Sequence, residues 1–156
     1  FDEALAILEQ ARSGFESTAT LADSLEAQAR IAECSLLSGK DKEPLVLVEE
    51  LLERTQAISG DSGPLAPMLY RLKGIALARL SEREDARAAL EKSVEVARAR
   101  NSLYDVGLAL GPLAALASSQ RSGENFAAER EAIFARLGVV RVPSDEIGSS
   151  LSARPS

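Results

Sequence analysis

The chain of 156 residues contains no histidine, no tryptophan and a single cysteine, Cys34. Without histidine there is no Ser-His-Asp triad, no Cys-His dyad and no metal site that uses imidazole. The lone cysteine excludes an internal disulfide and a zinc site built from clustered cysteines. Because no histidine base is present to activate it, we interpret Cys34 as a small packing residue. These absences predict a segment that is not an enzyme and that holds no cofactor and no metal.

The chain also has fewer basic than acidic residues: 18 lysines and arginines and 24 aspartates and glutamates give a net charge of -6. Neutralising phosphates requires clustered basic side chains, so this balance predicts no contact with nucleic acid. The longest stretch without charged or hydrogen-bonding side chains, residues 106–117, reaches only about half the length of a bilayer span. No basic segment followed by an apolar one, as in a secretory signal, is found. We therefore expect a cytoplasmic protein without membrane contact.

Alanine and leucine dominate the composition and β-branched residues are few, which favours helix over sheet. Turn-forming segments rich in glycine, serine and asparagine separate the apolar patterns. They divide the chain into about seven expected helices, over residues 2–17, 20–38, 42–58, 65–80, 82–100, 102–119 and 124–138. Pro112, which follows Gly111, is expected to kink or split the 102–119 helix. The sequence leaves open whether that segment is one helix or two.

Two helix starts carry recognisable capping residues. Ser81, with Glu84 three residues later, fits a capping box at the start of the 82–100 helix. Asp41 is expected to cap the 42–58 helix, and Pro44 lies in its first turn, where a missing N–H costs little.

Helix pairs recur along the chain at an interval of about 40 residues, which is typical of helical repeat proteins. Ala4 and Leu8 of the first helix fall in the same register as Ala86 and Leu90 of the fifth. Such pairs bury their apolar faces on their neighbours, which indicates an α-solenoid. The expected fold is therefore all-α, with antiparallel helix pairs stacked over residues 1–138. The remaining residues, 139–156, are rich in serine and are expected to form a disordered tail.

Residues 70–100 resemble one tetratricopeptide (TPR) repeat. The large and small residues at the packing positions of that family are matched by Tyr70, Gly74, Leu77, Ala86, Leu90 and Ser93. Gly74 is expected to allow a close approach of two helices, with Ala86 packed against it. The resemblance implies a TPR-like solenoid that binds a protein or peptide partner in its inner groove.

The chain starts directly in a helical pattern at Phe1, so we interpret it as a fragment whose first helix lacks its partner. Residues 131–140 resemble the closing helix of large bacterial signalling proteins. Those proteins combine an ATPase domain with a nucleotide-cyclase or DNA-binding domain. The resemblance implies a regulatory role as the C-terminal part of such a parent, whose other domains are possible partners, and it implies no activity in this segment.

Two groups of residues are candidates for contact with a partner. The first comprises side chains expected to line the inner groove: Arg30, Arg71, Lys73 and Tyr104. Its basic members are suited to an acidic peptide, unless they pair with glutamates of neighbouring helices. The second is an apolar face of the 102–119 helix, formed by Leu108, Leu110, Leu113 and Leu116. These leucines either dock a partner or belong to the core.

The function expected from these observations is a non-catalytic module for protein interaction or regulation. One alternative is a helical domain that senses a small-molecule effector, in a pocket where polar groups converge between apolar walls. Another alternative is a structural spacer within a larger protein.

Overall fold

The computed structural model describes residues 3–10, 21–140 and 142. Within these ranges the chain forms helices and contains no strand, which confirms the all-α prediction. The elements are α2 (Leu21–Leu37), α3 (Lys42–Ser59), the short 3-10 helix η1 (Gly60–Ser62), α4 (Ala66–Arg79), α5 (Arg83–Ala99), α6 (Leu103–Leu116) and α7 (Gln120–Leu137). Residues 3–10 are also helical. The rest of the first expected helix, and most of the expected tail, lie outside the described residues.

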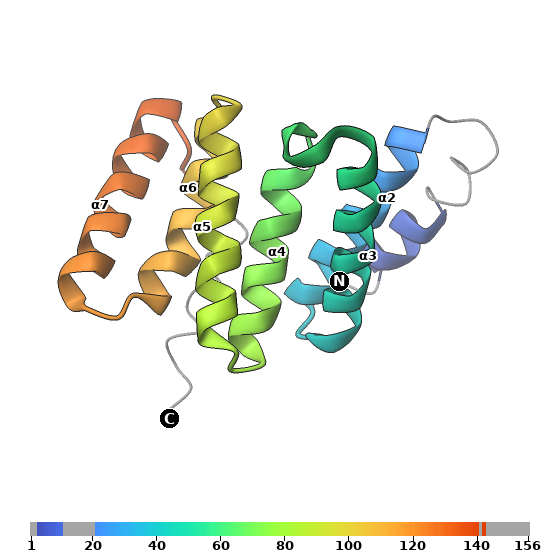
Figure 1. Cartoon of the computed structure of the whole chain (residues 1–156), viewed down its shortest axis with the longest axis horizontal. Coiled ribbons are helices and arrows are strands. Elements are labelled where there is room, and N and C mark those ends of the chain that lie inside the picture. Colours follow the sequence, from blue (N-terminus) through green and yellow to red (C-terminus); the bar gives the residue numbers. More distant parts are fainter. Residues whose placement is uncertain (1–2, 11–20, 141, 143–156) are drawn as a thin grey trace.

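The helices lie side by side in chain order along the long axis of the molecule, from α2 at one end to α7 at the other (Figure 1). Each helix packs against the next one in the chain, and α4 also contacts α2 and α6. The helices α2, α4 and α6 therefore form one layer, against which α3, α5 and α7 pack. This order of contacts is consistent with stacked helix pairs.

Two apolar clusters fill the space between the helices. The first joins α2, α3 and α4 around Leu36, Leu51 and Leu69. The second joins the end of α4 to α5 and α6, with Leu90 and Leu110 fully buried in it. Because each cluster is shared by three successive helices, α4 belongs to both cores and connects the two halves of the domain.

The α4 and α5 helices approach each other closely at Gly74, where the repeat pattern predicted a close approach. A methyl group added to Gly74 would lie 2.5 Å from Leu90 Cγ and 2.9 Å from the carbonyl oxygen of Ala86. Further along α5, Ser93 is fully buried and its hydroxyl donates a hydrogen bond to the carbonyl of Pro67 at 2.7 Å. The small residues at these positions let the helix backbones approach, and the serine satisfies its own polar group.

Four helices end in the same geometry, in which the two residues after the helix donate N–H groups back to carbonyls of the last turn. The residue in the left-handed conformation at these ends is Gly39, Ser81, Asn101 or Gly138. Ser81 has a φ of 69° and thus ends α4 instead of starting α5. The expected capping box is therefore wrong: Glu82 holds the N-cap position and makes no side-chain capping bond. Asp41 makes none either.

Replacing Ser81 with glycine is expected to raise the free energy of unfolding by about 1 kcal/mol, because a residue with a Cβ is strained in the left-handed region. Urea denaturation followed by circular dichroism measures the change. Ser119→Ala is the opposite control, since Ser119 is an N-cap whose hydroxyl accepts a hydrogen bond from the Ser122 N–H. That variant should lose about 1 kcal/mol. A Ser81→Gly variant no more stable than the parent would contradict the assignment of this helix end.

The last two helices differ from the prediction at their boundaries. Pro112 lies inside α6, which runs from Leu103 to Leu116, so the segment that the sequence left open as one helix or two is one helix. The α7 helix starts at Gln120 and not near residue 124, because Ser119 caps the polar segment that the sequence marked as a turn. Polar composition alone therefore placed the start of α7 too late.

Part of the expected tail packs on the domain. Val142 is only 4% exposed and lies in a small apolar cluster with Leu108 of α6 and Phe134 of α7. The expectation of disorder from residue 139 onward is thus wrong at Val142, while residue 141 and residues 143–156 are outside the described part of the chain.

Candidate functional site

A cavity of about 770 Å³ lies along the layer formed by α2, α4 and α6. Its walls come from these three helices, from the end of α3, from the loop that precedes α4 and from Val142. Cavities of this size hold drug-sized molecules or a few side chains of a partner, and they are usually apolar with a few polar groups.

The cavity walls are mainly apolar. They include Leu21, Leu25, Ile58, Leu65, Met68, Leu108 and Val142. Among these wall residues, Leu21 and Ile58 are unusually exposed for apolar side chains, at 57% and 61%. Tyr104, at the start of α6, lines the same cavity and is 45% exposed. Exposed apolar groups that gather at one concave site indicate a surface for binding.

The polar centre of the cavity is a glutamate held by two arginines. Arg71 on α4 is only 3% exposed, and its Nη2 donates to Glu33 Oε1 at 2.8 Å. Arg30, one turn before Glu33 on α2, donates to the other carboxylate oxygen at 3.2 Å. All three residues line the cavity. Glu33 therefore joins α2 to α4 at the cavity wall, because both of its oxygens are engaged with a guanidinium group.

The structure brings together three of the four residues predicted for the inner groove: Arg30, Arg71 and Tyr104. Lys73 is not among the residues that line the cavity. Its ammonium group lies 2.9 Å from Glu49 Oε1 of α3, in a partly exposed ion pair. Arg30, Arg71 and Lys73 thus all pair with glutamates, which is the alternative that the sequence left open.

Carboxylates outnumber guanidinium groups in the cavity wall. Arg30 and Arg71 are accompanied by Asp23, Glu26, Glu33 and Asp105. The charges of this cavity do not favour the expected acidic peptide, because its two cations are already bonded to Glu33 and further carboxylates line the same wall. Sequence reasoning missed these acids, although Glu26, Arg30 and Glu33 are spaced to lie on one face of α2.

The apolar face expected on the sixth helix is not exposed. Its four residues are 8% exposed or less: Leu108, Leu110, Leu113 and Leu116. The last three belong to the core shared with α5, and Leu108 contributes to the cavity wall and to the cluster around Phe134. Leu110, Leu113 and Leu116 are therefore core residues and not a docking face, and the continuous apolar sequence reflects burial on several sides.

Cys34 lies on α2 next to Glu33 but is not among the cavity residues. Burial raises the pKa of its thiol, and the Glu33 carboxylate raises it further. The thiol is thus predominantly protonated near neutral pH, which disfavours attack as a nucleophile. In the described ranges, no group of three or more acidic or cysteine side chains is placed to hold a metal ion.

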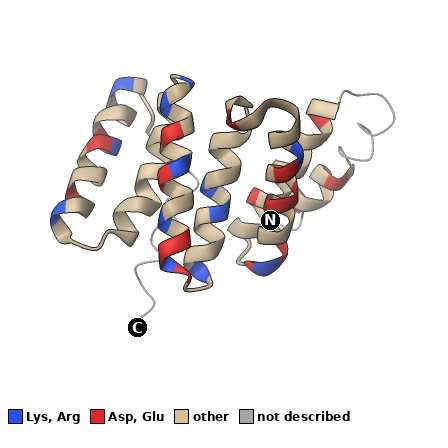
Figure 2. Ribbon diagram, viewed as in Figure 1, with Lys and Arg blue, Asp and Glu red and all other residues tan. Residues whose placement is uncertain are grey.

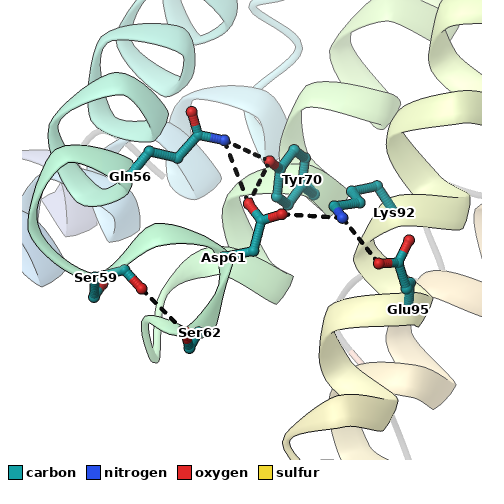
Figure 3. A network of polar contacts seen from close by, with 7 residues as sticks. All are labelled: Gln56, Ser59, Asp61, Ser62, Tyr70, Lys92 and Glu95. Carbon is teal, nitrogen blue, oxygen red and sulfur yellow. Dashed lines mark hydrogen bonds and ion pairs between the residues drawn. The ribbon is translucent and has the colours of Figure 1, made fainter.

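A second polar cluster holds the connection between α3 and α4 (Figure 3). The Tyr70 hydroxyl donates to Asp61 Oδ1 at 2.9 Å, and Gln56 donates to the Tyr70 oxygen at 2.8 Å. On the other side of Asp61, the Lys92 ammonium lies 3.0 Å from Oδ2 and also binds Glu95. This cluster ties η1 to α3, α4 and α5. Tyr70, expected as a packing residue, therefore also serves as a hydrogen-bond donor.

The cluster around Asp61 predicts a pH dependence of stability. The hydrogen bond from Lys92, followed by that from Tyr70, holds the pKa of Asp61 below its usual range. A lowered pKa in the folded state contributes stability above the unfolded pKa and loses it as the pH falls through the folded value. When the pH falls from 6 to 2, the Asp61→Asn variant should therefore lose less stability than the parent chain. The difference between the two losses should be less than about 1 kcal/mol, because the Asp61 carboxylate is partly exposed.

Urea denaturation at several pH values measures this difference, with Asp85→Asn, an exposed aspartate on α5 outside the cluster, as the control. The same difference in stability between the parent and Asp61→Asn at every pH would contradict the role given to Asp61.

Charged residues of both signs are interspersed along α5 and α7 (Figure 2). In the described part of the chain, no helix combines the length and the apolar character that crossing a bilayer would require. Comparison with protein-family models finds no match for this chain, and comparison with curated proteins finds none either. An assignment of function therefore depends on the geometry of the cavity.

Proposed function

We propose that the chain is a non-catalytic interaction module, a TPR-like α-solenoid that holds an apolar segment of a protein partner in the cavity along α2, α4 and α6. The observation that carries this proposal is the cavity itself. Its volume is about 770 Å³, and Leu21, Ile58 and Tyr104 are exposed around it. Burying such side chains against a partner gains free energy in proportion to the apolar area removed from water.

The walls of the cavity are held in place before any partner arrives. Glu33 fixes Arg71 and Arg30, as described above. On α6, the Tyr104 ring packs against Phe134 of α7 with centroids 6.2 Å apart, and the Arg130 guanidinium lies 4.8 Å from the centre of the Phe134 ring. A preformed site binds more tightly because fewer side chains lose freedom on association.

A tryptophan introduced by Tyr104→Trp tests the proposal, because the chain contains no other tryptophan. Its emission would report on the cavity alone. The probes are three peptides of equal length that alternate leucine with lysine, with glutamine or with glutamate. At least one of them should shift the emission to shorter wavelength in a saturable way, as the indole leaves water.

Ala88→Trp is the matched control, since Ala88 is an exposed alanine on α5 and does not line the cavity. Its emission should not change over the same titration. If no peptide shifts the emission of the Tyr104→Trp variant, or if both variants respond equally, the proposed function is wrong.

A small organic effector is a second candidate, because the volume and the Glu33 cluster also suit a drug-sized ligand. Nile red, a neutral apolar dye, distinguishes the two. Saturable binding of Nile red together with no response to any peptide would favour the effector. The role within a larger bacterial signalling protein stays a prediction.

A further inference from the structure

We infer that the partner segment held in the cavity is apolar and positively charged, an inference that rests on the proposed function. An acidic partner, which the basic residues suggested in the sequence, would meet more carboxylates than free cations there.

Both cations of the cavity are already engaged. Arg71 and Arg30 share the two oxygens of Glu33, and Arg30 also lies 3.6 Å from Glu26. An acidic side chain of a partner would have to displace Glu33 from these bonds. Such an exchange returns little free energy, because one carboxylate replaces another.

The wall as a whole is negative, because its two arginines, Arg30 and Arg71, are outnumbered by four carboxylates: Asp23, Glu26, Glu33 and Asp105. Asp23 and Glu26 are exposed and lie one turn apart near the start of α2, while Asp105 is half-buried at the start of α6. They approach the cavity from two helices of the same layer. A lysine or arginine of the partner is therefore attracted from both sides, while its apolar neighbours fill the cavity.

The aromatic ring of Tyr104 adds to the attraction of a cation. It lies next to Asp105 in the wall and is 45% exposed. An ammonium or guanidinium group near the face of a tyrosine ring is attracted by the quadrupole of the ring. The combination of carboxylates and an aromatic ring favours a basic side chain over a neutral polar one.

A buried donor in the wall favours a peptide over a hydrocarbon. The Nε of Arg71 is buried and has no hydrogen-bond partner among the described residues, and the side chain as a whole is only 3% exposed. Buried donors are nearly always satisfied, so an unpaired one at a ligand cavity points to an acceptor supplied from outside. A partner backbone carries carbonyl oxygens that can take this bond after a small movement of the side chain.

The titration with the three leucine peptides tests the inference in the full chain carrying Tyr104→Trp. The leucine–lysine peptide should bind about tenfold more tightly than the leucine–glutamine peptide, and the leucine–glutamate peptide should bind most weakly. Added salt should reduce the preference for lysine, because the charges at the mouth are exposed.

Asp23→Asn combined with Glu26→Gln should weaken binding of the lysine peptide more than binding of the glutamine peptide, and should thereby remove most of the roughly tenfold preference for lysine. Glu50→Gln combined with Glu53→Gln changes the net charge by the same amount on exposed positions of α3 outside the cavity, and it should keep the preference. Equal loss in both double variants would show general charge attraction and would overturn the inference.

Failure of the inference is distinguishable from failure of the proposed function. Cavity binding with equal affinity for the lysine and glutamate peptides overturns the inference and leaves the proposed function standing. No binding of any peptide overturns both.

Discussion

Replacing Glu33 with alanine is expected to lower the free energy of unfolding by about 3 kcal/mol, because the variant leaves Arg71 as an uncompensated buried charge. Arg71 is 3% exposed, and its Nη2 lies 2.8 Å from Glu33 Oε1. The expected loss lies at the low end for broken buried pairs, since Glu33 itself is 21% exposed. Chemical denaturation followed by circular dichroism measures it.

Two further variants test whether the loss comes from the stranded charge. Glu49→Ala removes the partner of Lys73, the neighbouring cation of α4, in a more exposed pair, and should cost less than about 1 kcal/mol. Combining Glu33→Ala with Arg71→Met should recover part of the stability lost by Glu33→Ala alone, because no buried charge then remains. Equal losses for Glu33→Ala and Glu49→Ala would contradict the importance given to burial at the cavity wall.

Replacing Gly74 with alanine is expected to destabilise the domain by about 2 kcal/mol, although alanine favours helix over glycine. The added methyl group would lie 2.9 Å from the carbonyl oxygen of Ala86, which is backbone and cannot rotate away. The α4 and α5 helices must then move apart, which loosens the contact that connects the two cores. Thermal and urea denaturation both measure the effect.

Gly111→Ala is the matched control for this substitution. Gly111 is also a helical glycine, but a Cβ there would meet the Arg130 side chain at 3.3 Å, and that side chain is long and flexible. The variant should be neutral or slightly stabilising, since the gain in helix propensity is about 1 kcal/mol. A Gly74→Ala variant as stable as Gly111→Ala would contradict the close packing of α4 on α5.

The helices could be predicted from the sequence because their signals are local. Apolar periodicity and turn residues placed the main helices to within a few residues, and the small residues around Gly74 marked a close helix contact. The helix ends were less predictable. Serine is a favourable N-cap residue, yet Ser81 ends the preceding helix with a left-handed φ of 69°.

The candidate site could be predicted only in part, because burial depends on partners distant in sequence. Arg30, Arg71 and Tyr104 were singled out as basic or aromatic residues of the groove, and they share the cavity. The sequence alone does not show that both arginines donate hydrogen bonds to Glu33. Nor does it show that the leucines of α6 are covered by α5 and α7, or that Val142 folds back onto Leu108.

A basic apolar segment that binds in the cavity along α2, α4 and α6 should protect the backbone of the helices that form its walls. Hydrogen–deuterium exchange of the unmodified chain, with and without the leucine–lysine peptide, measures this protection. We expect slower exchange at the first turns of α2 and α6, which carry Leu21 and Tyr104, with no change in α5 and α7. Protection confined to α5 and α7, or spread equally over all helices, would contradict the claim.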